Sequence, residues 1–431
     1  MSELLRITGK GALRGEIRVA GDKSISHRGL LFGALATGET TLAGFLASED
    51  TRATAGALRA LGVTIDEGET VRITGVGLHG LHAPAGPLWM GNSGTTTRLL
   101  LGVLAGQPFT SVLEGDPSLS RRPMDRVLIP LRQMGAVASG QGEKHTPPVT
   151  ITGGALRPID YTSPVASAQL KSALLLAGLY ADGVTTVTEP MKSRDHTERM
   201  LRGFGVEVVE SGLTVSIRGS QQLRGRHVAV PGDISSAAFF LVAGCIIPGA
   251  EITVRHVGVN PTRAGIIDVL QAMGADLSIS NAREEGGEPV ADLTVRHSKL
   301  HGTVIGGELI PRLIDELPVL AVAAAFAKGV TVIRDAAELR VKESDRIVTM
   351  GNFLRDMGAQ VQEQPDGMVI TGGKPLHSAQ VESAHDHRVA MSAAIAALAA
   401  GVTAEISGAE TIATSFPNFL ELLRSLGWDG E

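Results

Sequence analysis

Three basic side chains stand close together in the stretch Gly21-Asp22-Lys23-Ser24-Ile25-Ser26-His27-Arg28. A strand-like run over residues 16–20 precedes it, and an apolar run over 29–36 follows and ends at Thr37-Gly38, as helices commonly end. The stretch therefore opens a predicted helix. A helix N-terminus carries about half a positive charge and favours acidic neighbours. Basic residues at this position indicate that an anion such as a phosphate or carboxylate binds there.

The same stretch could also be an ordinary helix cap or a nucleotide-binding P-loop. Asp22 or Ser24 could simply cap the helix, with the cations solvated at the surface. A nucleotide-binding P-loop also has Lys and Ser between a strand and a helix, but it requires Gly directly before the Lys. Asp22 stands at that position, so the P-loop is excluded.

Composition limits the classes of function. The chain has 431 residues, of which 43% are apolar and 19% charged, as expected of a globular protein with two or three domains. The formal net charge of −6 argues against nucleic acid or a membrane surface as a general partner. Any anion binding must therefore come from local basic clusters.

The single cysteine and the short apolar runs bear on redox chemistry and on the cellular compartment. Cys245 is the only cysteine, which excludes an intramolecular disulfide, and its apolar surroundings predict a core position. Residues 1–15 lack an apolar signal segment, and runs such as 237–247 and 318–327 are too short to span a bilayer. We therefore expect a cytoplasmic protein.

One pattern recurs six times along the chain. A polar motif opens an Ala- and Leu-rich helix, a β-rich strand follows, and a second helix ends at Gly. The spacing is roughly 70 residues, longer than the periods of about 20–50 found in solenoids. The opening motifs are Asp22-Lys23-Ser24, Gly91-Asn92-Ser93-Gly94, Ser167-Ala168-Gln169, Gly232-Asp233-Ile234-Ser235, Ile314-Asp315-Glu316 and His385-Asp386-His387-Arg388. The glycines that end the second helices are Gly62, Gly135, Gly205, Gly274, Gly358 and Gly427.

Each repeat predicts a βαβαββ unit. The glycine stands where a left-handed C-cap belongs, and the residues after it alternate as in a strand. Repeated six times, this unit gives an α/β protein with apolar helices buried against sheets. Periodicity alone leaves open whether the units group as two threes or as three twos.

A structural array could carry the same repeats without any chemistry, but the helix starts favour binding. A scaffold would place Asp and Glu at helix starts, whereas this chain gathers cations there. A shared cleft for anionic ligands is the more economical explanation. The cations are Lys23, Arg28, Arg98, Arg121 and Arg122 before Pro123 (a residue favoured at the first helical position), Arg194, Lys342, Arg346 and Arg388.

Eight motifs occur in order over the whole length. They are residues 21–28, Gly91-Asn92-Ser93-Gly94-Thr95-Thr96-Thr97-Arg98, Ser120-Arg121-Arg122-Pro123-Met124, Ser167-Ala168-Gln169-Leu170-Lys171-Ser172-Ala173, Ser193-Arg194-Asp195-His196-Thr197-Glu198, Asp315-Glu316-Leu317-Pro318, Lys342-Glu343-Ser344-Asp345-Arg346 and His385-Asp386-His387-Arg388. Together they resemble the motifs of the 5-enolpyruvylshikimate-3-phosphate synthase family, in its bacterial class with Ser-Ala-Gln.

The resemblance implies a fold. It has two domains of three βαβαββ repeats each, an inside-out α/β barrel, with the active site in the interdomain cleft. One domain comprises residues 1–20 together with 233–431, and the other comprises residues 21–232. The crossings are expected near Ala20-Gly21 and Pro231-Gly232, where the glycines suit hinges.

The resemblance also implies a reaction, which moves the enolpyruvyl group of phosphoenolpyruvate to the 5-hydroxyl of shikimate 3-phosphate in the shikimate pathway towards aromatic amino acids. Both substrates carry a phosphate and a carboxylate, which a cation-lined cleft can bind. Residues implied for shikimate 3-phosphate are Lys23, Ser24, Arg28, Ser167, Ala168, Gln169, Arg194, Asp315 and Lys342. Those implied for phosphoenolpyruvate are Lys23, Asn92, Gly94, Arg122, Gln169, Arg346 and Arg388.

Catalysis in such a reaction needs paired acid and base groups. A proton must reach the methylene carbon of phosphoenolpyruvate, and another must leave the 5-hydroxyl before phosphate is eliminated from a tetrahedral intermediate. Lys23, Asp315 and Glu343 are the candidates, and the sequence does not divide the steps among them. Either carboxylate could instead be a helix cap.

Three positions bear on how closely the predicted site matches that of the family. A side chain at Gly94 would intrude on the enolpyruvate site, so the resemblance implies sensitivity to glyphosate, although a purely structural glycine is the alternative. Ala168 lacks the second hydroxyl of the Ser-Ser-Gln class, and Thr414 stands where many relatives have a Lys that binds phosphoenolpyruvate.

Other functions are less consistent with the motifs. The sister transferase that uses UDP-N-acetylglucosamine typically has a Cys in the loop near Arg122, and residues 115–122 contain none. A non-catalytic anion-binding relative would lack one of the three candidate acid and base residues. His385 and His387 flank Asp386 without clustered ligands, so we expect no metal and no organic cofactor. The expected partners are the two small-molecule substrates, with no nucleic acid, no membrane and a monomeric state.

Overall fold

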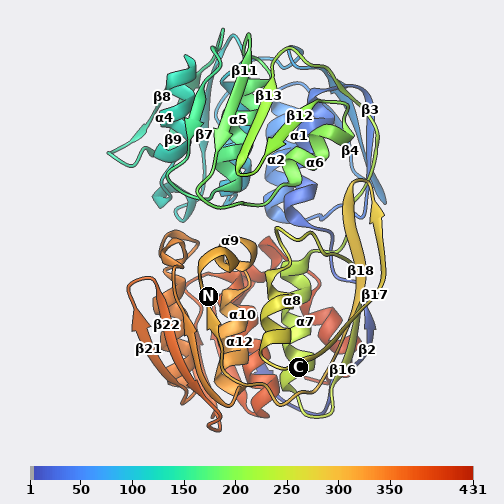
Figure 1. Ribbon diagram of the computed structural model, residues 1–431, viewed down its shortest axis with the longest axis vertical. Coiled ribbons are helices and arrows are strands. Elements are labelled where there is room, and N and C mark those ends of the chain that lie inside the picture. The colour runs from blue at the N-terminus through green and yellow to red at the C-terminus, as the bar shows by residue number, and fades with distance from the viewer. Residues whose placement is uncertain (1–3, 431) are drawn as a thin grey trace. The chain divides into compact units, whose positions relative to one another are not determined.

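The computed structural model describes residues 4–430, so the outermost residues of the predicted domain at 1–20 and 233–431 lie outside the described part. Contacts divide the chain into two compact units (Figure 1). Unit 1 comprises Met1–Ala20, Pro231–Glu284 and Pro289–Glu431, and unit 2 comprises Gly21–Val230 and Glu285–Glu288. Compared with the predicted boundaries, unit 1 gains residues 231–232, and the short hairpin tip at 285–288 belongs to unit 2.

Unit 2 contains three sheets, each with a parallel pair at one edge and antiparallel neighbours after it. The first is β14 (Leu223–Arg224), β3 (Ala36–Ala43), β5 (Thr70–Val76) and β4 (Thr64–Asp66), with β15 (His227–Ala229) also on β3. The second is β6 (Leu88–Trp89), β7 (Thr110–Glu114), β9 (Thr146–Thr152) and β8 (Val137–Gln141). The third is β10 (Asp160–Thr162), β11 (Val184–Thr188), β13 (Thr214–Arg218) and β12 (Val208–Ser211).

Unit 1 also contains three sheets. The first is β17 (Asp276–Glu285), β18 (Glu288–Arg296), β16 (Glu251–Gly258) and β2 (Arg14–Ile17). The second is β19 (Val304–Ile305), β20 (Gly329–Ile333), β22 (Gly367–Gly372) and β21 (Gln360–Gln364). The third has β1 (Leu5–Thr8), β24 (Thr403–Ser407) and β23 (Ala379–Glu382).

The helices alternate between a buried helix and a more amphipathic one. In unit 2 they are α1 (Lys23–Leu35), α2 (Glu49–Ala60), α3 (Gly94–Leu104), η1 (Leu119–Arg121), α4 (Asp125–Met134), α5 (Ala168–Gly178) and α6 (His196–Gly203). In unit 1 they are α7 (Ile234–Ile246), α8 (Gly265–Ala272), η2 (Gly307–Leu309), α9 (Ile310–Leu313), α10 (Leu317–Phe326), η3 (Ala337–Val341), α11 (Arg346–Asp356), α12 (His387–Ala400), η4 (Ala409–Thr414) and α13 (Phe419–Ser425).

The predicted βαβαββ repeat is confirmed, with a rearrangement that the sequence did not reveal. In the third sheet of unit 2 the order β10, α5, β11, α6, β12, β13 follows the predicted pattern directly. The strand-like run before Gly21 was expected in the domain that contains residues 233–431, and β2 pairs in parallel with β16 of unit 1. The first sheet of unit 2 is completed instead by β14 and β15, which come from the end of that unit.

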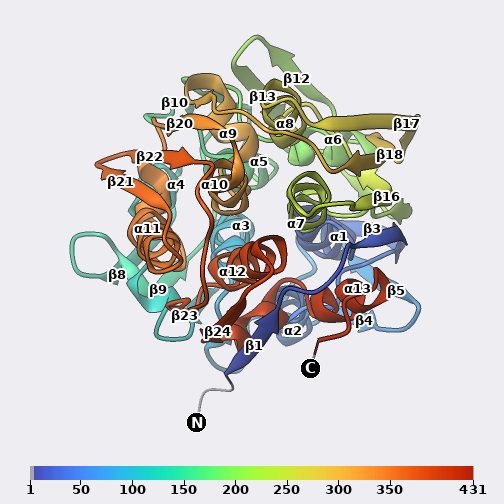
Figure 2. The same cartoon turned by 90° about the horizontal axis from the view of Figure 1, so that it is seen from below.

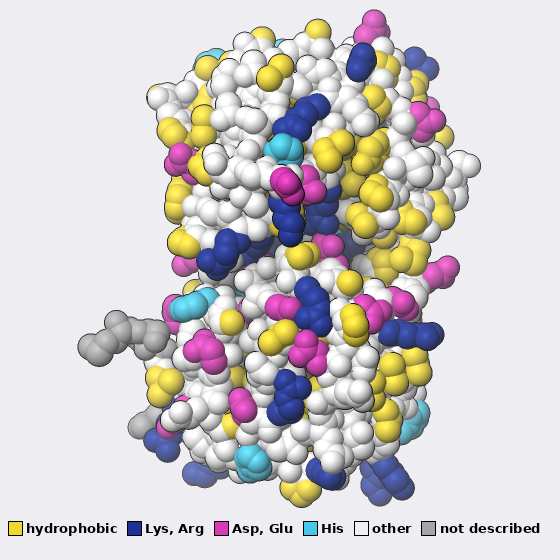
Figure 3. Space-filling model, turned by 90° about the vertical axis from the view of Figure 1, so that its left-hand side faces the viewer, with side chains coloured by type: hydrophobic (Ala, Val, Ile, Leu, Met, Phe, Trp, Pro, Cys, Tyr) yellow, Lys and Arg dark blue, Asp and Glu magenta, His cyan; other side chains and the backbone are white. Residues whose placement is uncertain are grey.

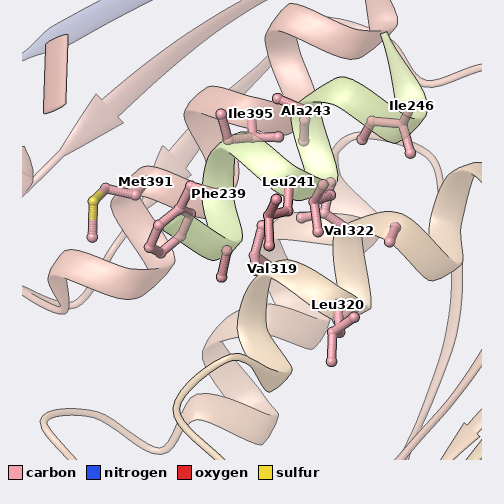
Figure 4. Packing of buried hydrophobic residues seen from close by; sticks show 14 of the residues in the cluster. Phe239, Leu241, Ala243, Ile246, Val319, Leu320, Val322, Met391 and Ile395 are labelled. Carbon is pink, nitrogen blue, oxygen red and sulfur yellow. The ribbon is translucent and has the colours of Figure 1, made fainter. Parts of the chain in front are cut away.

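The buried helices form the core of each unit. In Figure 2, α7, α10 and α12 of unit 1 lie side by side with strands of that unit around them, which is the predicted inside-out arrangement. All 13 residues of α7 are buried, and Cys245 is among them as predicted. Figure 4 shows Phe239 of α7, Val319 and Val322 of α10 and Ile395 of α12 gathered between these helices. Full burial of each large apolar side chain contributes about 1.5–3 kcal/mol to folding, so this packing stabilises the arrangement of the three helices.

Helix ends agree with the sequence in most places. All six predicted cap glycines have positive φ, between 87° at Gly205 and 115° at Gly135, which a side chain would disfavour. Two predicted ends are wrong. Helix α1 does not end at Thr37-Gly38 but passes at Ala36 directly into β3. Pro123 does not begin a helix, because α4 starts at Asp125.

Candidate active site

The α1 start places Lys23 beside a carboxylate that sequence reasoning missed. Asp22 caps the helix by accepting the Ile25 amide hydrogen at 2.8 Å. The Lys23 Nζ lies 3.0 Å from Asp50 Oδ2 on α2, and both side chains are less than a fifth exposed. Asp50 belongs to an acidic first turn, which sequence reasoning would have interpreted only as helix stabilisation.

His27 and Arg28 are buried further along α1. The His27 Nδ1 lies 2.7 Å from Thr54 Oγ1, and burial, with Lys23 and Arg28 nearby, holds the pKa of His27 well below its usual value. His27 is therefore neutral and not one of the cations that the sequence suggested. Arg28 is 3% exposed, and burial lowers its pKa to about 10, so it stays charged at neutral pH.

Neutral groups hold the Arg28 guanidinium. Its Nε donates to Thr197 Oγ1 at 2.7 Å, Nη2 donates to Ser172 Oγ at 2.8 Å, and Nη1 donates to the Ser24 carbonyl at 3.0 Å. These contacts link the starts of α1, α5 and α6. Arg28 thus supplies positive charge to this junction while its donors are engaged within unit 2.

The second repeat gathers two arginines around Gly94, the first residue of α3. The Arg122 Nη2 donates to Asn92 Oδ1, and Asn92 Nδ2 donates to Asp116 Oδ2 at 2.7 Å. A methyl group built at Gly94 would lie 2.9 Å from Arg98 Nη1 and 3.3 Å from Arg122 Nη1. Glycine at this position therefore leaves room for both guanidinium groups.

The start of α5 joins the second and third repeats. Ser167 caps the helix, with its Oγ accepting the Leu170 amide hydrogen at 3.4 Å. The Gln169 side chain accepts from Arg98 Nη1 at 2.7 Å and donates to Thr95 Oγ1 at 2.9 Å. Ala168 is the first helical residue, and Arg194, partly exposed, lies two residues before α6. The unit 2 residues of the predicted site thus lie at neighbouring helix starts.

Unit 1 brings together carboxylates and cations at the starts of α10, α11 and α12. Arg346, 1% exposed, places Nε 2.8 Å from Asp386 Oδ2 and Nη2 2.6 Å from Glu343 Oε2. Burial alone would lower the pKa of Arg346, but Asp386 and Glu343 outweigh it and raise the pKa. Burial alone would raise the pKa of Asp386, but Arg346 outweighs it and the net shift is downward.

Asp315 lies at the centre of this cluster. Its Oδ1 is 3.6 Å from both Lys342 Nζ and Arg346 Nη1, and its carbonyl accepts from Arg388 Nη1 at 2.9 Å. Burial lowers the pKa of Lys342, and Asp315 opposes that shift. Asp315 is therefore held between two cations.

The remaining predicted positions have ordinary contacts. His385 Nδ1 lies 2.9 Å from Glu410 Oε1 at the surface, and His387 is the first residue of α12. Thr414 ends η4 and donates to the Thr411 carbonyl at 2.6 Å. Among residues 4–430, no group of three His, Cys, Asp or Glu side chains is placed to hold a metal ion, and no helix could span a membrane. Figure 3 shows groups of Lys and Arg side chains with Asp and Glu between them on one face.

The fold is that of the enolpyruvyl transferases. The enolpyruvyl transferase NikO from Streptomyces tendae matches with a TM-score of 0.77 at 19% identity, over 99% of this chain and 98% of that one. At this identity the likeness shows the fold alone.

The chain belongs to the EPSP synthase family. The family model described as EPSP synthase (3-phosphoshikimate 1-carboxyvinyltransferase) matches residues 7–423. Relatives named 3-phosphoshikimate 1-carboxyvinyltransferase include those of Gloeobacter violaceus, 58% identical over 98% of this chain and 99% of its own, and Geobacillus kaustophilus, 56% identical over 97% and 99%. An EPSP synthase structure from Acinetobacter baumannii matches with a TM-score of 0.87 at 50% identity, over 98% of each chain. The predicted family is confirmed, and the chain is an enzyme of that family.

Proposed function

We propose that this protein transfers the enolpyruvyl group of phosphoenolpyruvate to the 5-hydroxyl of shikimate 3-phosphate and releases phosphate. The observation that carries the proposal is the unit 1 cluster, in which Asp315 and Glu343 lie within ion-pair distance of buried Arg346. Such a cluster offers carboxylates for proton transfer beside cations for phosphate and carboxylate groups. The active site in the interdomain cleft and the domain boundaries at residues 20, 21, 232 and 233 are part of this proposal.

Phosphoenolpyruvate is assigned to Lys23, Asn92, Gly94, Arg122, Gln169, Arg346 and Arg388. Guanidinium groups can meet two oxygens of a phosphate or carboxylate at once, which favours arginine for this dianionic ligand. Shikimate 3-phosphate is assigned to Lys23, Ser24, Arg28, Ser167, Ala168, Gln169, Arg194, Asp315 and Lys342. In that assignment Arg28 supplies positive charge and holds α1, α5 and α6 together through the three hydrogen bonds described above.

The chemistry proceeds by addition and then elimination. The 5-hydroxyl loses its proton as its oxygen bonds to C2 of phosphoenolpyruvate, and C3 gains a proton, which gives a tetrahedral intermediate. Loss of a proton from C3 then restores the double bond as phosphate leaves. Asp315 is assigned to the hydroxyl proton, and Glu343 and Lys23 to the C3 protons and the leaving phosphate.

The test is phosphate release by the purified protein with phosphoenolpyruvate and one of two acceptors. We expect release with shikimate 3-phosphate and none with UDP-N-acetylglucosamine. Cys245 is buried in α7 and does not lie in the loop near Arg122, so this thiol does not supply the loop cysteine of the sister enzyme. Release with the second acceptor alone, or with neither, would overturn the proposal.

The proposal extends to a cytoplasmic monomer that acts without metal or organic cofactor and is inhibited by glyphosate. The absence of a membrane-spanning helix among residues 4–430 supports the first part, and one chain supplies every assigned residue. Light scattering at working concentration tests the monomer, where a dimer mass would contradict it. Full activity after treatment with EDTA tests the absence of a metal.

A further inference from the structure

Three buried charged residues of unit 2 have no part in the reaction proposed above. The Lys171 Nζ lies 2.8 Å from Glu189 Oε2 and 2.7 Å from Glu198 Oε1. The exposed fractions of the three side chains are 1%, 2% and 0%. Buried ion pairs lose hydration and are weak contributors to stability compared with apolar side chains of the same size. The triad of Lys171, Glu189 and Glu198 therefore calls for a role other than stability.

The triad joins two segments that carry predicted substrate-binding residues. Lys171 lies one turn into α5, and its amide donates to the carbonyl of Ser167 at 3.0 Å. Glu189 directly follows β11, and Glu198 lies in the first turn of α6. The segment between these two glutamates contains Arg194, and the α5 start contains Gln169. Lys171 thus ties one predicted binding segment to the other.

Ser193, the neighbour of Arg194, contacts the triad through three of its own polar groups: the amide, the hydroxyl and the carbonyl. The Ser193 amide donates to Glu189 Oε2 at 3.3 Å, and its hydroxyl donates to Glu189 Oε1. The Lys171 Nζ donates to the Ser193 carbonyl at 3.5 Å. The backbone immediately before Arg194 is therefore fixed against α5.

The same junction extends to Arg28 through two hydroxyls. Ser172 follows Lys171 and Thr197 precedes Glu198, and their hydroxyl oxygens lie 2.6 Å apart. Both hydroxyls also accept from Arg28, as described above. The starts of α1, α5 and α6 are thus linked by one buried polar network.

We propose that Lys171, Glu189 and Glu198 are positioning residues for the shikimate 3-phosphate part of the site. They fix the loop that carries Arg194 against the α5 start, so that Arg194 and Ser167 meet the same phosphate group. A preorganised loop loses less conformational entropy when the ligand binds. The inference depends on the proposed function and adds residues that do not touch either substrate.

The triad is expected to matter more for one substrate than for the other. Its contacts lie on α5, on α6 and in the loop before α6. Arg122, Asn92 and Gly94, which are assigned to phosphoenolpyruvate alone, lie at the start of α3 and after η1, whereas Gln169 at the α5 start is assigned to both substrates. Loss of the triad should therefore raise the KM for shikimate 3-phosphate selectively.

The main experiment compares Lys171→Met with Leu175→Ala, a control on the same helix. For Lys171→Met we expect a KM for shikimate 3-phosphate raised about tenfold, with the KM for phosphoenolpyruvate within about twofold, since one lost charge-assisted contact corresponds to about tenfold in affinity. Leu175 is 0% exposed, so its truncation destabilises the helix packing without touching the triad. Both KM values should stay near wild type in this control.

Ser193→Ala provides a milder variant, because Lys171→Met leaves two buried carboxylates and could fail to fold. It removes only the hydroxyl that donates to Glu189, and we expect the KM for shikimate 3-phosphate to rise about threefold at an unchanged kcat. Equal rises in both KM values, no rise in Ser193→Ala, or the same selective rise in Leu175→Ala would overturn the inference. Wild-type protein without phosphate release would instead overturn the proposed function, so the two failures are distinguishable.

Discussion

The two units hold their buried arginines in different ways. In unit 2, Arg28 donates to the hydroxyls of Thr197 and Ser172, and Arg98 donates to the Gln169 amide. In unit 1, Arg346 is paired with the carboxylates of Asp386 and Glu343. Hydroxyl and amide groups orient a guanidinium without cancelling its charge, whereas carboxylates orient it and neutralise it.

This difference suggests that the two units have different functions in the reaction. A cluster with hydroxyl and amide partners keeps its positive charge for an incoming phosphate. A cluster with carboxylate partners also contains groups that can take up and release protons. We therefore assign most of the binding to unit 2 and most of the proton transfer to unit 1, with Lys23 as the exception.

The largest effect is expected at that exception, because Lys23 is a unit 2 cation of the predicted site and is paired with a carboxylate, Asp50, at 3.0 Å. Lys23→Met removes a proton donor and a charge that both substrates are expected to meet. We expect kcat to fall by about 1,000-fold, within the range for loss of an acid–base group, with the thermal midpoint changed little. Lys10→Met, at an exposed position, is the control. Activity within tenfold of wild type would remove Lys23 from the mechanism.

Breaking a unit 1 ion pair should lower the free energy of unfolding and change how that free energy depends on pH. Asp386→Asn leaves buried Arg346 without one of the two carboxylates that it contacts within 3 Å, which should cost about 3 kcal/mol at pH 7. The pKa of Asp386 is lowered in the folded protein, so its contribution is present above the unfolded pKa and is lost as the pH falls through the folded pKa. The difference in unfolding free energy between variant and wild type should therefore shrink from pH 7 towards pH 3, as measured by urea unfolding. A difference that stays constant would contradict this role.

Much of the difference between the two units could be predicted from the sequence, because the patterns that indicate it are formed by residues close together in the chain. Cations at helix starts and the six cap glycines depend on neighbouring residues, and the structure agrees with both except at His27 and at Arg121 and Arg122, which lie at the end of η1. The neutrality of His27 follows from burial beside Thr54, and helical periodicity does not measure burial. The carboxylate partner of Lys23 was also missed, since Asp50 comes from the next helix.

Long-range pairing is what the local patterns leave open. The run before Gly21 is a strand, as its alternation indicated, but that alternation did not identify its partner β16, more than 200 residues away in the chain. Alternation specifies a strand and its faces, not its partner. The hairpin tip at Glu285–Glu288 joined unit 2 through the His196–Glu288 contact at 2.8 Å, which no local motif reveals.

An intermediate effect is expected when a unit 2 arginine is removed. Arg122→Ala deletes the guanidinium that Asn92 orients, so the KM for phosphoenolpyruvate should rise about 30-fold. The KM for shikimate 3-phosphate should change less than about threefold, because Arg194 and Ser167 are untouched. Steady-state kinetics with each substrate varied in turn make the comparison. Equal loss for both substrates would contradict the assignment of Arg122 and weaken the contrast between the units.

The smallest effect is expected from a methyl group at Gly94. The added carbon would lie 2.9 Å from Arg98 Nη1 and 3.3 Å from Arg122 Nη1, and these flexible ends can move aside. Gly94→Ala should therefore displace two cations without removing them, and raise the KM for phosphoenolpyruvate about fivefold while weakening glyphosate inhibition.

Stability should change in the opposite direction, which separates a site effect from general damage. Ala in place of Gly within a helix adds up to about 1 kcal/mol of stability, and Gly94 does not have positive φ. Gly56→Ala in α2 is the matched control, because a methyl group there meets nothing within 4 Å. Both variants should unfold at higher temperature, but only Gly94→Ala should lose affinity for phosphoenolpyruvate. An unchanged KM in Gly94→Ala would mean that this glycine serves the helix turn alone, and that the unit 2 arginines tolerate displacement.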